Sequence, residues 1–228
     1  MHSTSTDVTR RRIVVIGLIV GPLLLVLSNA FTIQESDSMR STFDAMVASP
    51  WMLFAESLLE AVGFTIALAS FAGSAHALRA RGGALGTVGA VLCMLGILGF
   101  SLSAAGGFFL YVVAQLHDKD AGFAAASALK EDGVTGVLLM VLMVLGEAGI
   151  CLVIGGLLRA HIVRIWPLLL VLLGVVADNV LPGPLSSIVA DLLLLAASVW
   201  IAILLVRAPL AVWLGDTETA TSSVAQSA

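Results

Sequence analysis

Acidic side chains lie inside the long apolar runs of this chain, where water cannot solvate them. They are Glu56, Glu60, Glu147, Asp178 and Asp191. No Lys or Arg lies deep within these runs to pair with them. An ionised carboxylate at the centre of a membrane-spanning helix costs about 2.5–3.5 kcal/mol on insertion scales. We therefore expect these side chains to face the interior of a helical bundle, to be protonated, or both.

Carboxyl groups in such a place can bind a cation, relay protons or receive a cationic solute. Burial and neighbouring like charges both favour the protonated form, which suits proton-coupled chemistry. The sequence leaves a second interpretation open, in which the carboxyl groups are neutral and hydrogen-bond to polar groups of adjacent helices. In that case they hold helices together and bind no ligand.

The depth of each acidic residue in its run suggests a funnel. Glu60 and Glu147 fall near the middle of their runs, and Glu56 lies one turn from Glu60 on the same helix face. Asp178 and Asp191 fall near the outer boundary, on either side of a Leu-Pro-Gly-Pro turn. If all five point inward, the funnel opens outward and narrows to a pair formed by Glu60 and Glu147.

The elements that must position these residues are membrane-spanning helices. The chain of 228 residues is 59% hydrophobic and 11% charged, against about 25% charged residues in soluble domains. A spanning helix needs about 20 apolar residues, and continuous runs lack the period-two alternation of a membrane barrel. Six runs qualify: 13–31, 51–73, 85–115, 134–158, 163–181 and 186–206.

The predicted fold is therefore an all-α, polytopic membrane bundle with six transmembrane helices. One domain covers 13–207, and the polar ends, 1–12 and 208–228, are predicted to be disordered tails. Segments 32–50 and 116–133 are predicted loops. The run 85–115 is too long for a bilayer, so it must tilt, protrude or break at Gly106-Gly107. Glycines in 85–115 and 134–158 offer small surfaces for close helix packing.

The distribution of positive charge predicts the orientation, because Lys and Arg concentrate in short cytoplasmic loops. With the N-terminus inside, cytoplasmic segments hold eight basic residues and external segments hold three. The eight are Arg10, Arg11, Arg12, Arg79, Arg81, Arg159, Arg164 and Arg207, and the three are Arg40, Lys119 and Lys130. Both termini are therefore predicted to be cytoplasmic.

The first run has an alternative interpretation as a cleaved signal peptide. Three arginines precede it, and it ends in Ser28-Asn29-Ala30, which fits a small-x-small cleavage site. The run is longer than the 7–15 residues usual for such a segment. Cleavage would leave five spans and would not change the orientation of the others.

Other chemistry has little support in the sequence. Cys93 and Cys151 lie in apolar runs without zinc-site spacing, and the histidines lie in loops or in the tail, where they cannot hold a buried haem. Hydrolase and protease motifs do not occur, and no basic patch suggests nucleic acid. We expect no cofactor, no enzymatic activity and no nucleic-acid partner.

At 155–174, the stretch GGLLRAHIVRIWPLLLVLLG resembles small, uncharacterised bacterial multi-pass membrane proteins, in which a Leu-Arg-Ala turn and a Trp near the inner face open the next span. The resemblance implies a bacterial inner membrane and no particular activity. Two functions remain as expectations. One is a small transporter, or a sensor, of protons, cations or a cationic solute. The other is a structural or accessory subunit that packs in the bilayer against a partner or a second copy of itself.

Overall fold

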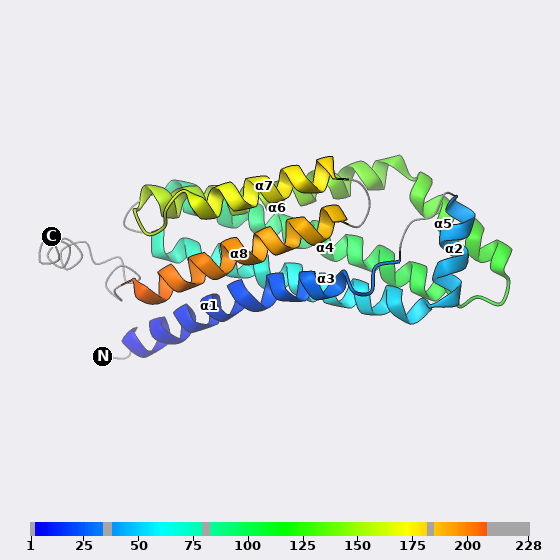
Figure 1. Cartoon of the computed structure of the whole chain (residues 1–228), viewed down its shortest axis with the longest axis horizontal. Helices are drawn as coiled ribbons and strands as arrows, with labels where there is room; N and C mark the ends of the chain where they lie inside the picture. The colour runs from blue at the N-terminus through cyan, green and yellow to red at the C-terminus, as the bar shows by residue number, and fades with distance from the viewer. Residues whose placement is uncertain (1–2, 34–37, 79–82, 182–184, 209–228) are drawn as a thin grey trace, which may run out of the picture.

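The computed structural model describes residues 3–33, 38–78, 83–181 and 185–208, and these are helical with no strand. Figure 1 shows long helices lying side by side. In chain order the elements are α1 (Ser3–Ser28), α2 (Met39–Ala48), α3 (Pro50–Ser74), η1 (Ala75–Leu78), α4 (Gly83–Ala114), α5 (Lys119–Glu131), α6 (Gly133–Arg159), α7 (Trp166–Val180) and α8 (Leu185–Arg207).

Five helices are long and apolar enough to cross a membrane, so the chain is a multi-pass membrane protein. The candidate spans are Thr6–Ser28, Pro50–Leu78, Gly83–Ala114, Gly133–Arg159 and Leu185–Arg207. The sixth predicted span, 163–181, is shorter than expected, because α7 has 15 residues. At 1.5 Å per residue, α7 is about 22 Å long, against about 30 Å of hydrocarbon.

The turn before α7 explains its late start. His161 adopts φ 57°, and its N–H donates to the carbonyl of Leu158 at 3.0 Å. The N–H of Ile162 donates to the carbonyl of Leu157 at 2.9 Å. These two bonds form a Schellman motif, which ends α6 and turns the chain before α7 begins at Trp166.

Helix α1 differs from the prediction at both ends. It begins at Ser3, so residues 3–12, predicted to be a disordered tail, are helical. Extending an existing helix costs far less than nucleating one, and the guanidinium of Arg11 donates a hydrogen bond to the carbonyl of Val206 on α8. At the other end the helix stops at Ser28, and Asn29 and Ala30 form a turn. The predicted tail 208–228 lies outside the described residues except Ala208.

The six longest apolar helices form a ring. Helix α1 packs on α3 and α8, α4 packs on α3 and α6, and α7 runs along α8. The contact between α6 and α7, which closes the ring, is sparse by comparison. The start of α1 and the end of α8 lie at the same end of the bundle (Figure 1).

Glycines let the helices approach closely, as predicted for the third and fourth runs. A Cβ atom on Gly96 would lie 2.4 Å from the Cα atom of Gly146, and one on Gly149 would lie 2.6 Å from the backbone nitrogen of Cys93. On Gly107, a Cβ atom would lie 2.0 Å from Oγ of Ser57. Gly106-Gly107 is therefore a packing position and not a break, because α4 continues through it.

Two short helices occupy the segments 32–50 and 116–133, which were predicted to be loops. Helix α2 begins at a capping box on Ser38, and Asp118 accepts hydrogen bonds from the first turn of α5. Phe43, Val113 and Ala126 form a small apolar cluster that joins α2 and α5 to the end of α4. These helices lie at the end of the bundle opposite the start of α1 (Figure 1). The end of α4 therefore packs outside the ring.

An ion pair ties the two short helices together. The guanidinium of Arg40 on α2 lies 2.8 Å from the carboxylate of Asp120 on α5 and 5.0 Å from the centroid of the Phe123 ring. The hydrogen bond with Asp120 raises the pKa of Arg40 above its ordinary value. Both side chains are solvated, so the pair orients the helices more than it stabilises them.

Candidate functional site

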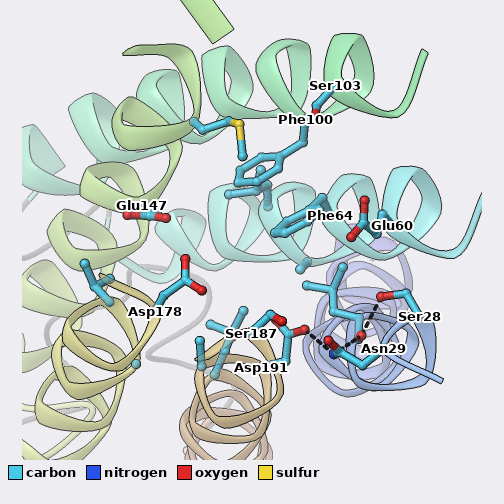
Figure 2. Close-up of a pocket in the computed structure, with 18 of the residues that line it drawn as sticks. Ser28, Asn29, Glu60, Phe64, Phe100, Ser103, Glu147, Asp178, Ser187 and Asp191 are labelled. Atoms are coloured by element: carbon cyan, nitrogen blue, oxygen red, sulfur yellow. Dashed lines mark hydrogen bonds between the residues drawn. The ribbon is translucent and has the colours of Figure 1, made fainter. Parts of the chain in front are cut away.

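One cavity of about 320 Å³ lies inside the ring, and all five predicted acidic residues line it. Glu56 and Glu60 come from α3, Glu147 from α6, Asp178 from α7 and Asp191 from α8. Figure 2 shows several of these side chains around the cavity. The five acidic residues therefore share one space between the helices.

The cavity lies in the half of the bundle farther from the start of α1. It is lined by the end of α1 and the turn after it, by α3 from Glu56 to Leu68, by the middle of α4 and α6, by α7 from Val171 to Asp178, and by the first half of α8. The other half is close-packed, because Leu18, Phe71, Leu78, Ile154 and Leu157 are fully buried there. The cavity is therefore sealed by a solid core toward the end at which α1 starts.

Polar residues at the end of α1 also line the cavity. The side-chain amide of Asn29 donates to Oδ2 of Asp191 at 2.8 Å and to the carbonyl of Leu25 at 3.0 Å. The side chain of Thr32 hydrogen-bonds to Glu56. Ser28 lines the cavity too, but its hydroxyl donates a hydrogen bond to the carbonyl of Leu25 at 2.7 Å.

The sequence did not predict that Ser28, Asn29 and Thr32 line the site. In the sequence, Ser28 and Asn29 fit a small-x-small cleavage site as well as a polar end of a span. An Asn at the end of an apolar run was the available signal, because a polar side chain in a span normally faces other helices. Its partner, Asp191, is 162 residues away in sequence and could not be inferred from spacing.

The carboxyl groups are neighbours in a different order from the one predicted. Glu60 is close enough to Glu56 and Asp191, and Glu147 to Asp178, for their charges to interact when both partners are ionised. Asp191 and Asp178 are close to each other in the same sense. In Figure 2, Glu60 and Glu147 lie on opposite sides of the rings of Phe64 and Phe100. Glu60 and Glu147 therefore do not form the expected narrow pair. Instead, Glu60 neighbours Asp191 and Glu147 neighbours Asp178.

Most of the remaining wall is apolar. The rings of Phe64 and Phe100 are stacked, with centroids 3.6 Å apart and planes 12° from parallel. Other apolar lining residues are Leu25, Ala67, Leu68, Met143, Ile150, Val171, Val175 and Leu194. None of the described residues that line the cavity is basic. The cavity thus offers negative charge and apolar surface together.

The carboxyl residues that line the cavity differ in exposure. Asp178 lines the cavity and is nevertheless exposed, whereas the other four carboxyl residues are half-buried. It lies in the last turns of α7, on the helix that closes the ring only sparsely against α6. The α6–α7 seam, where these two helices face each other, is therefore the least tightly packed contact in the ring around the cavity.

The spacing of the acidic side chains limits which ligands the cavity can hold. Among the described residues, no three acidic, His or Cys side chains converge closely enough to hold a metal ion. The carboxyl groups are spread around the wall, so they present several separate negative charges. This arrangement can hold protons or receive a cationic group at more than one place. Comparisons with protein-family models, with curated proteins and with solved structures find no match to this chain.

Proposed function

We propose that this protein is a small transporter, or a sensor, that binds protons, cations or a cationic solute in its acidic cavity. The observation that carries the proposal is that carboxyl groups from four helices line one cavity with no basic side chain among its described lining residues. An ionised carboxyl group inside a membrane protein costs free energy. Several such groups around one space therefore favour binding of a ligand or proton that neutralises them.

The orientation follows from the basic residues at the two ends of the bundle. Arg10, Arg11 and Arg12 lie near the start of α1, and Arg159, Arg164 and Arg207 flank the helix ends at the same side of the ring. Arg40 and Lys119 belong to the short helices at the opposite end. Arg79 and Arg81 lie outside the described residues. We infer cytoplasmic termini in a bacterial inner membrane, with the cavity in the outer half of the bundle.

Flux measurements on the full chain in liposomes test the proposal. We expect Glu60→Gln and Glu147→Gln each to lower a proton- or cation-driven flux at least tenfold, because each removes a charge from the cavity with little change in shape. Glu131→Gln is the matched control, since Glu131 is exposed at the end of α5 and does not line the cavity. Elution volume and helical content serve as checks on folding. Undiminished flux in both cavity variants would refute the proposal.

The alternative is a structural or accessory subunit whose carboxyl groups are neutral and hydrogen-bonded. The bonds from Asn29 to Asp191 and between Thr32 and Glu56 favour it. Most predicted glycine surfaces are used inside the chain, but Gly133, Gly136 and Gly155 on α6 have open space where a side chain would lie. A partner or second copy bound there would support this alternative, and measurement of the mass in detergent by light scattering detects it.

A further inference from the structure

The carboxyl groups in the cavity are spread along its wall and do not form a compact cluster. Glu60, Asp191, Asp178 and Glu147 line the cavity from α3, α8, α7 and α6, and Figure 2 shows them spread across it, with Glu60 at one side and Glu147 at the other. We call these four residues the acidic arc. Its ends lie on α3 and α6, on opposite sides of the Phe64 and Phe100 rings (Figure 2). A compact cation can contact only one part of such an arc.

The wall between the ends of the arc suits a hydrocarbon chain. The stacked rings of Phe64 and Phe100 lie beside the apolar side chains of Leu68, Met143 and Leu194, which line the same cavity. Methylene groups gain about 0.8 kcal/mol each when they leave water for such a surface. Ring faces also attract cations, so the aromatic pair tolerates an ammonium group nearby.

The cavity volume fits a small organic molecule. About 320 Å³ lies at the lower end of the roughly 300–1,000 Å³ typical of ligand pockets and is far more than a bare ion needs. Five carboxyl groups without a basic lining residue also leave room for more than one positive charge when they are ionised. Size and charge together therefore favour a ligand that is both organic and multiply cationic.

We propose that the ligand is a linear alkyl diamine or polyamine, with one ammonium group at Glu60 and Asp191, another at Glu147 and Asp178, and its methylene chain across Phe64 and Phe100. This inference rests on the proposed function, in that it names the class of cation the cavity takes. Each ammonium group forms charge-assisted hydrogen bonds with carboxylates. Because the two ammonium groups share one chain, binding of the first raises the effective concentration of the second.

Calorimetric titration of the full chain in detergent tests the inference. The probes are unbranched α,ω-diaminoalkanes with three to eight carbons and n-alkylamines with the same numbers of carbons. We expect the best diamine to bind at least tenfold more tightly than its matched monoamine, with an optimum chain length set by the distance between the ends of the arc. A diamine advantage that does not depend on chain length would overturn the two-ended site.

Variants locate the two ammonium groups. Glu147→Gln removes one end of the arc, so it should abolish most of the diamine advantage while leaving monoamine affinity within a few-fold of the original value. Glu60→Gln should do the same from the other end, and Glu131→Gln should leave both affinities unchanged. The comparison of diamines with monoamines on the unaltered chain needs no variant, so a variant that fails to fold does not remove the test.

The outcomes separate this inference from the function on which it rests. If diamines and monoamines bind equally, or if no amine binds while Glu60 still supports proton or cation flux, the diamine inference is wrong and the transport proposal stands. If no amine binds and the flux does not depend on Glu60 or Glu147, both are wrong. Tight, length-dependent diamine binding that requires both ends of the arc supports both.

Discussion

At the scale of single residues, the acidic side chains of the apolar helices share one cavity, and all of them except the exposed Asp178 are half-buried. Their polar neighbours come from other helices, as Asn29 on the turn after α1 does for Asp191 on α8. A carboxyl group that accepts a hydrogen bond avoids part of the cost of leaving water. The same residues are therefore candidates for ligand binding and contributors to helix packing, and substitution can separate the two roles.

We expect Asn29→Ala to lower the free energy of unfolding in detergent, because Asp191 would lose its amide donor. A double-mutant cycle with Asp191→Ala, which removes the acceptor, should give a coupling energy of about 0.5–1.5 kcal/mol, the usual net value of one hydrogen bond. The measurement is a titration with SDS in which the loss of helical circular dichroism monitors unfolding. Additive effects of the two substitutions would show that the 2.8 Å bond contributes no stability.

At the scale of helices, hydropathy located most spans to within a few residues but said little about the segments between them. Helix α3, for example, covers Pro50–Ser74 where the run 51–73 was predicted. The short helices α2 and α5 were missed because their mixed composition resembles a loop. Their stability comes from the end caps at Ser38 and Asp118 and from the contact of Phe43 with Val113 and Ala126, which involves three separate segments.

Close packing of α4 on α6 gives a prediction at this scale. Gly96→Ala should destabilise the protein by about 1–3 kcal/mol, because the new methyl group would meet the Gly146 backbone at 2.4 Å. Gly136→Ala is the matched control on α6, since nothing lies within 4 Å of its Cβ position. That variant should be neutral or gain up to about 1 kcal/mol from helix propensity. Thermal unfolding in detergent compares the two, and equal losses would contradict the packing.

At the scale of the whole molecule, the ring of helices encloses a cavity on one side and a solid core on the other. The cavity half carries the acidic residues, and the core half joins the ends of the helices that bear Arg11, Arg159 and Arg207. The α6–α7 seam is the sparsest helix contact in the ring, and Asp178, in the last turns of α7, is exposed. The acidic residues of the bundle thus lie in the cavity half, whereas Arg11, Arg159 and Arg207 lie in the other half, toward the end at which α1 starts.

The proposed orientation predicts which end a reagent outside the cell can reach. In a Cys93→Ala, Cys151→Ala background, Lys119→Cys should react with a membrane-impermeant maleimide on intact cells. Arg164→Cys should react only after the membrane is permeabilised. Both positions are exposed on the protein, so a difference in labelling reports the side of the membrane. The reverse pattern would place the termini outside.

The sequence by itself determined the class of protein, the approximate limits of the long helices and the need for the acidic residues to face inward. These follow from hydropathy and from backbone hydrogen bonding in lipid, which depend on local composition. Only the tertiary structure decided which carboxyl groups are neighbours, that Asn29 and Thr32 join them, and that α7 is short. Helix rotation and contact across long separations are set by packing, and the spacing of residues along one helix cannot specify where another helix lies.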